Sequence, residues 1–116
     1  MLVAMNREER EFADRRGLRF PFDCDAEILL EGADRRVRAR VTELSFRGCF
    51  LEIAGSWTEQ QRMQVKILHT DESFEASAHL IYVRAGGIGL MFDEIDSRNR
   101  NVLQDWILSA LDNQAK

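Results

Sequence analysis

The feature that most constrains the fold is a regular alternation of apolar and polar residues in segment 20–30. The apolar side chains are Phe20, Phe22, Cys24, Ala26, Ile28 and Leu30. Successive side chains of a β-strand point to opposite faces, so a period of two predicts a strand with one face in a core. Pro21 fits the start of this strand, where no ladder donor is required.

The same period recurs along the chain and predicts five further strands. They are centred on Val37–Val41, Cys49–Ile53, Val65–Leu68, Phe74–Tyr82 and Ile88–Phe92. The phase slips after Val41, so a bulge or strand end is expected near Thr42–Ser45. Turns are predicted at Glu31–Asp34 and, as a tight hairpin, at Gly86-Gly87.

The period changes near the C-terminus, where apolar residues pair at every fourth position. They are Val102, Leu103, Trp106, Ile107, Ala110 and Leu111. This stripe predicts an amphipathic helix, with Asp96 or Ser97 as its N-cap. Six short antiparallel strands and one helix predict a mainly β fold, a closed or nearly closed barrel with a C-terminal α-helix packed over an opening.

Length and composition narrow the class of protein. A chain of 116 residues has the size of one domain. No apolar run approaches the roughly 18 residues that span a bilayer, and the apolar Met1–Met5 lacks a basic lead-in and a cleavage site, so we expect no membrane insertion and a cytoplasmic protein. Cys24 and Cys49 lack the close spacing of zinc ligands and are predicted to be buried thiols.

Nothing in the sequence indicates catalysis. His69 and His79 are isolated, the acidic residues form no pair marked out by spacing, and no phosphate-binding loop of the GxxxxGK[ST] type is present. We therefore expect that the protein is not an enzyme. The net charge of −4 also argues against a general nucleic-acid binder.

Arginines gather in the N-terminal part of the chain. Ten of them precede residue 49, and Arg15-Arg16-Gly17-Leu18-Arg19 comes directly before the first strand. Guanidinium forks suit phosphate, and Gly17 adds the flexibility to fold over a ligand. The alternative is a solvated charged arm. A second polar segment, Glu43-Leu44-Ser45-Phe46-Arg47-Gly48, could present a carboxylate and a hydroxyl to a base, or be a strand end followed by a turn.

Together the two segments resemble the PilZ family, whose signature is RxxxR before the first strand and (D/N)xSxxG about 20–30 residues later. Residues 15–19 fit the first motif in full, and segment 43–48 fits the second at Ser45 and Gly48. The resemblance covers about residues 14–111. We interpret 14–116 as a PilZ domain and 1–13 as an N-terminal arm.

The resemblance implies a six-stranded barrel that binds the bacterial second messenger cyclic di-GMP without another cofactor. Arg15 and Arg19, with Arg16 beside them, would hold phosphates and stack on guanine. Glu43, Ser45 and Gly48 would meet a guanine, and Tyr82 resembles an aromatic residue late in the family's fifth strand. The ordered arginine segment would then signal to a separate, unidentified protein partner.

Glu43 departs from the Asp or Asn of the family. It keeps a carboxylate that can accept from guanine, but its side chain is one methylene longer, and it could instead pair with Arg47 or Arg40. A PilZ-type adaptor that binds no nucleotide is therefore an alternative. A barrel for single-stranded nucleic acid is a further one, although the basic face of Arg36, Arg38 and Arg40 lacks the exposed aromatics that this function needs.

Overall fold

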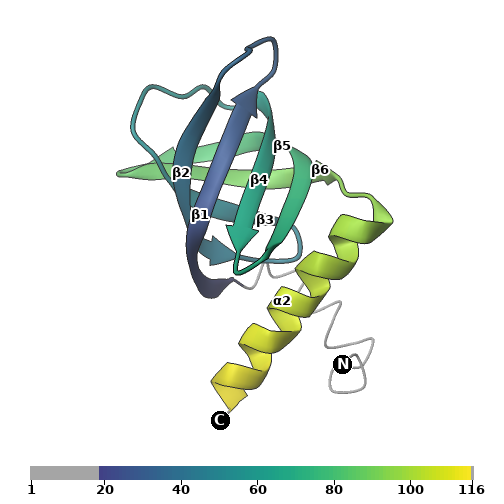
Figure 1. Ribbon diagram of the computed structural model, residues 1–116. Coiled ribbons are helices and arrows are strands. Elements are labelled where there is room, and N and C mark those ends of the chain that lie inside the picture. The colour runs from purple at the N-terminus through teal and green to yellow at the C-terminus, as the bar shows by residue number, and fades with distance from the viewer. Residues whose placement is uncertain (1–18, 116) are drawn as a thin grey trace.

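A computed structural model describes residues 19–115, in which six strands close into an antiparallel barrel (Figure 1). The strands are β1 (Phe20–Leu30), β2 (Arg36–Leu44), β3 (Gly48–Glu52), β4 (Arg62–His69), β5 (Glu72–Arg84) and β6 (Gly87–Glu94). Their order around the barrel is β1-β2-β3-β6-β5-β4, and β1 pairs with β4 to complete the ring. The predicted barrel with its C-terminal helix is confirmed.

The alternating apolar residues fill the inside of this ring. The largest fully buried side chains include Ile28, Val41, Leu51, Ile67, Phe74, Leu80 and Ile88, which come from all six strands. Strand β2 is the partial exception, because Val37 near its start remains 37% exposed. The basic beginning of β2 therefore lies beyond the edge of the core.

Two of the register shifts in the barrel affect which of the predicted site residues face outward. The pairing of β2 with β3 shifts register between Val41 and Glu43, as the predicted phase slip requires. A second shift, between Leu80 and Tyr82 in β5, was not expected from the regular alternation there. Because a bulge reverses the alternation, Leu80 is buried in the core while Tyr82 lies on the outer wall.

The predicted turn at Gly86-Gly87 is wrong by one residue. The two turn residues are Ala85 and Gly86, and Gly86 has a φ of 86°. Gly87 already belongs to β6, where it pairs with Glu52 of β3. A glycine is needed at the turn for its positive φ, whereas Gly87 is needed for close packing against β3.

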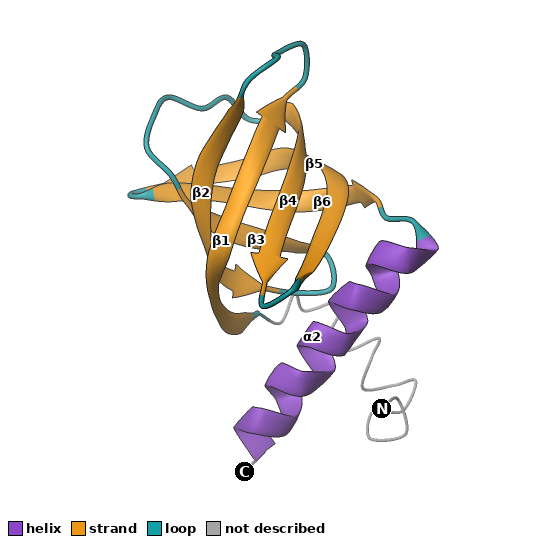
Figure 2. Cartoon of the chain, viewed as in Figure 1, coloured by secondary structure: helices purple, strands orange, loops and turns teal. Residues whose placement is uncertain are grey.

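Helix α2 (Ser97–Ala115) leans against one end of the barrel (Figure 2). Asp96 is its N-cap, because Asp96 Oδ1 accepts a hydrogen bond of 2.8 Å from the backbone N–H of Asn99. Trp106 anchors the helix: its Nε1 donates to Glu72 Oε1 at 3.2 Å and its ring stacks on Phe22 at 5.5 Å. Within residues 19–115, no helix has the length and apolarity needed to cross a membrane.

Candidate functional site

One row of residues crosses four neighbouring strands on the outer wall of the barrel. Cross-strand pairing aligns Glu43 of β2 with Phe50 of β3, Phe50 with Gly89 of β6, and Gly89 with Tyr82 of β5. Since Gly89 has no side chain, the Tyr82 ring lies over it, with its centre 6.3 Å from that of Phe50 and the rings 19° from parallel. The wall here carries an aromatic surface beside a carboxylate.

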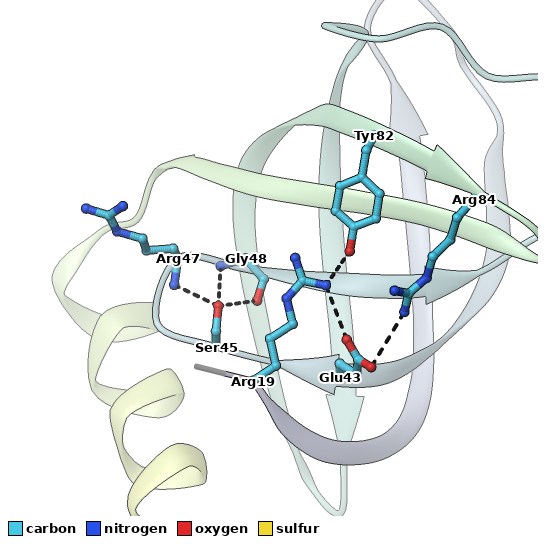
Figure 3. A network of polar contacts seen from close by, with 7 residues as sticks. All are labelled: Arg19, Glu43, Ser45, Arg47, Gly48, Tyr82 and Arg84. Carbon is cyan, nitrogen blue, oxygen red and sulfur yellow. Dashed lines mark hydrogen bonds and ion pairs between the residues drawn. The ribbon is translucent and has the colours of Figure 1, made fainter. Parts of the chain in front are cut away.

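Arg19, directly before β1, reaches into this row (Figure 3). Its Nη1 lies 3.2 Å from Glu43 Oε1 and also donates to the Tyr82 hydroxyl. Its guanidinium carbon is 5.3 Å from the centre of the Tyr82 ring. Burial acts to lower the pKa of Arg19, but the contacts with Tyr82 and Glu43 outweigh it and raise the pKa. Three predicted site residues from distant segments thus meet at one place.

A second arginine, Arg84 at the end of β5, completes the network, although it belongs to neither of the two sequence motifs. Its Nη2 lies 3.5 Å from Glu43 Oε2, and its guanidinium carbon lies 4.0 Å from the centre of the Phe50 ring. The two oxygens of Glu43 therefore face two different guanidiniums. The signal in the sequence was its position two residues after Tyr82, which places both side chains on the same face.

The suggested pairing of Glu43 with Arg47 or Arg40 is replaced by these contacts with Arg19 and Arg84. Arg40 instead pairs with two acidic residues of β1, Asp23 and Asp25. Arg38, also on the basic face of β2, lies opposite Glu27 of β1. Acidic neighbours thus offset this face, which weakens the alternative of a single-stranded nucleic-acid groove.

Ser45 lies just past the end of β2 and is 5% exposed. Its hydroxyl accepts from the backbone N–H of Gly48 at 3.1 Å and from that of Arg47 at 3.2 Å, and it donates to the Gly48 carbonyl at 3.2 Å. All three contacts lie within the turn that joins β2 to β3. The local role of Ser45 is to hold this turn, which in turn positions Glu43 on one side and Phe50 on the other.

Gly48 is also fixed by packing. A Cβ atom on this residue would lie 1.9 Å from the backbone oxygen of Leu90 in β6. The close approach at Gly48 is one of backbone to backbone, and it allows β3 to pair with β6. No other residue type fits this position without moving a strand.

The remaining predicted residues, Arg15 and Arg16, lie outside the described residues, as does the arm 1–13. Cys24 and Cys49 are free and buried, as predicted. Among residues 19–115, no group of three or more His, Cys, Asp or Glu side chains is arranged to hold a metal ion. The described part of the site consists of guanidiniums, aromatic rings and one carboxylate, which suits an anionic ligand with aromatic groups.

Comparison with known proteins agrees with this architecture. The structure resembles the PilZ domain of CeSA from a cellulose-synthesizing bacterium, with a TM-score of 0.66 and 12% identity over 79% of this chain and 96% of that one. It also resembles the Bacillus subtilis inhibitor of motility MotI/DgrA, with a TM-score of 0.72 and 16% identity over 85% of this chain and 52% of that one. An uncharacterized Legionella protein has a TM-score of 0.54 and 14% identity, over 85% of this chain and 99% of that one.

These structural similarities concern the fold alone, whereas the family is shown by comparison of the sequence. No curated protein matches the chain. Residues 7–109, however, match the PilZ domain, and this stretch includes both signature motifs and all six strands. The chain therefore belongs to the PilZ domain family.

Proposed function

We propose that this protein is a receptor for cyclic di-GMP. The observation that carries the proposal is the meeting of Arg19, Glu43 and Tyr82, which come from the two signature motifs and from β5. The ligand has two phosphates and two guanines, and the site offers guanidinium donors, a carboxylate acceptor and an aromatic ring. Each chemical group of the ligand thus has a counterpart on the wall.

The internal ion pairs are weak enough for such a ligand to replace. The side chains of Arg19 and Glu43 are 33% and 36% exposed, and exposed pairs contribute about 0–1 kcal/mol each. A micromolar ligand gains about 8 kcal/mol on binding. Opening the Glu43 contacts therefore costs a small part of the binding free energy, while it releases both the guanidiniums and the carboxylate for the ligand.

The proposed mechanism is a switch without bond chemistry. Segment 14–19 closes over the dinucleotide, Arg15 and Arg19 hold its phosphates, and Arg16 adds a third positive charge beside them. The closed segment and the ligand then form a new surface next to the barrel. A separate protein partner recognises that surface.

Calorimetric titration with cyclic di-GMP tests the proposal. The wild type should bind, while Arg15→Ala and Arg19→Ala should each weaken binding by about tenfold or more, as loss of a charge-assisted contact requires. The matched control is Arg36→Ala, since Arg36 is exposed at the end of β2 away from Glu43. Absence of binding by the wild type at micromolar protein and low salt contradicts the receptor function.

A second candidate, an adaptor that binds protein but no nucleotide, is favoured by one observation. Glu43 already contacts both Arg19 and Arg84, so part of the positive charge of the described site is compensated within the protein. This candidate predicts no heat and no change of melting temperature with cyclic di-GMP, together with a protein partner whose capture is independent of the nucleotide. The same titration therefore separates the two candidates.

A further inference from the structure

We propose that Arg84, together with Glu43, recognises the hydrogen-bonding edge of a guanine, so that Arg84 determines specificity for guanine over adenine. This inference rests on the proposed function and deepens it, because it assigns a role to a residue outside both signature motifs. It follows from how the Arg84 side chain is held and from what lies next to it.

The Arg84 guanidinium is held in place by aromatic rings. Its central carbon lies 4.0 Å from the centre of the Phe50 ring and 5.8 Å from that of Tyr82. A guanidinium that rests on a ring keeps the N–H groups along its edge available for in-plane hydrogen bonds. The Arg84 side chain is also 51% exposed, so a ligand can reach this edge.

The neighbour of Arg84 provides the complementary group. Arg84 Nη2 lies 3.5 Å from Glu43 Oε2, so the open wall presents donors directly beside an acceptor. Glu43 itself is 36% exposed. The contact between them is long enough that both groups retain hydrogen-bonding capacity toward a third partner.

A guanine edge fits this pair and an adenine edge does not. Guanine has the O6 acceptor next to the N1–H and amino donors, so O6 faces Arg84 while the donors face Glu43. Adenine has the opposite order, with an amino donor at position 6 and an acceptor at N1. It would place N–H groups against the guanidinium and a lone pair against the carboxylate.

The rival role for Arg84 is structural, as a cover for Phe50, which is 5% exposed. The two roles predict different results for Arg84→Ala and Arg84→Lys. As a cover, the long side chain affects the melting temperature, and lysine largely replaces it. As a guanine-recognising residue, Arg84 affects affinity, and lysine fails because it lacks the planar fork.

The experiment measures the affinity of the wild type, Arg84→Ala, Arg84→Lys and the control Arg36→Ala for cyclic di-GMP and for cyclic di-AMP by calorimetry and competition. We expect Arg84→Ala and Arg84→Lys to bind cyclic di-GMP about 10- to 100-fold more weakly, which matches the loss of one good base contact. Arg36→Ala should bind as the wild type does. The preference for cyclic di-GMP over cyclic di-AMP should fall at least about tenfold in both Arg84 variants.

The outcomes are distinguishable. If the wild type binds cyclic di-GMP and Arg84→Ala binds it equally well, the role of Arg84 is overturned while the receptor function stands. Equal weakening toward both dinucleotides also overturns the specificity role, since it reports a loss of charge alone. If the wild type binds neither dinucleotide, the proposed function fails and takes this inference with it.

Discussion

The ring of Tyr82 occupies the space that a side chain on Gly89 would need. A Cβ atom on Gly89 would lie 2.1 Å from Tyr82 Cε1, and the two residues are cross-strand partners in β5 and β6. The missing side chain of one strand thus makes room for the aromatic ring of the next. This packing brings the Tyr82 hydroxyl to Arg19. Gly89 thus shapes the site although it has no side chain to contact a ligand.

Gly89→Ala is therefore expected to damage the site more than the fold. The added methyl group displaces a side chain that can rotate into solvent, so Tyr82 moves and its contact with Arg19 is lost. We expect about tenfold weaker binding of cyclic di-GMP, the loss of roughly one charge-assisted hydrogen bond, with a small change of melting temperature. Calorimetry and thermal denaturation measure the two effects, and unchanged affinity would show that Tyr82 is dispensable.

Gly48→Ala, in contrast, should damage the fold more than the site. Its added methyl group meets the backbone oxygen of Leu90 at 1.9 Å, and a strand cannot rotate away as a ring can. Overpacking of this kind costs about 1–3 kcal/mol of the free energy of unfolding. Urea denaturation without ligand measures it, with Gly89→Ala as the matched control. A Gly48→Ala variant as stable as the wild type would contradict the packing role.

Ser45→Ala should destabilise the protein even when no ligand is present. The substitution leaves the buried N–H of Gly48 and the part-buried N–H of Arg47 without the hydroxyl that accepts from them, at a cost of about 1–3 kcal/mol. The control is Ser109→Ala, since Ser109 is exposed on α2. If Ser45→Ala unfolds at the same urea concentration as the wild type but loses nucleotide binding, the hydroxyl serves the ligand and not the turn.

Most of the fold could be predicted from the sequence, but the bulge that turns Tyr82 outward could not. The periods of the apolar residues were sufficient to predict all six strands and the helix, because local period and burial agree in a small barrel. Asp96, which caps the helix, was one of the two N-caps expected. The period alone could not predict the outward position of Tyr82. That position depends on a bulge between Leu80 and Tyr82, and a bulge is specified by pairing with β6, which is a non-local property.

The contacts at the candidate site were also predicted only in part. Arg19, Glu43 and Tyr82 were expected at the site, and the structure brings them into contact. The contacts of Arg84 with Glu43 and Phe50 were not predicted, because they depend on a cross-strand row that no short motif encodes. Such a row depends on which strands are neighbours and in which register, and this information appears only once the barrel has closed.

Glu43→Asp should strengthen nucleotide binding. Aspartate is the shorter carboxylate that the family signature favours, and it is less able to reach Arg19 and Arg84, which lie 3.2 and 3.5 Å from the two oxygens of Glu43. We expect about tenfold tighter binding of cyclic di-GMP by calorimetry, since both guanidiniums are then released. Glu43→Gln is the control, because it keeps the length but loses the charge, and it should bind more weakly than the wild type.

The two buried cysteines give a test of the core that is independent of the ligand. Burial raises the pKa of Cys24 and of Cys49 from an ordinary value of 9.0 to about 12. In the folded state both thiols are therefore neutral and should resist alkylation at pH 8, whereas the denatured chain should react quickly. Rapid alkylation of the native protein would contradict the closed core.

The same shift fixes the sign of a pH effect. The folded state favours the neutral thiols, so the unfolded chain loses these protons first as the pH rises. The contribution of the two thiols to the free energy of unfolding is therefore complete below pH 9 and decreases between about pH 9 and about pH 12. Replacing both residues by Ala should remove this part of the alkaline decrease. Urea denaturation at pH 8 and pH 10.5 measures it, and an unchanged pH dependence in the double variant would contradict it.

The pairing of β1 with both β2 and β4 has a consequence for how a partner can associate. The closed ring leaves only short strand segments paired on one side, such as residues 36–39 of β2 and 72–76 of β5, so a peptide or a second copy finds no full-length strand edge to extend. A partner that docks on the barrel therefore engages mainly side chains on its wall, its ends or the flanking helix. This restriction makes charge and shape on those surfaces the determinants of partner choice.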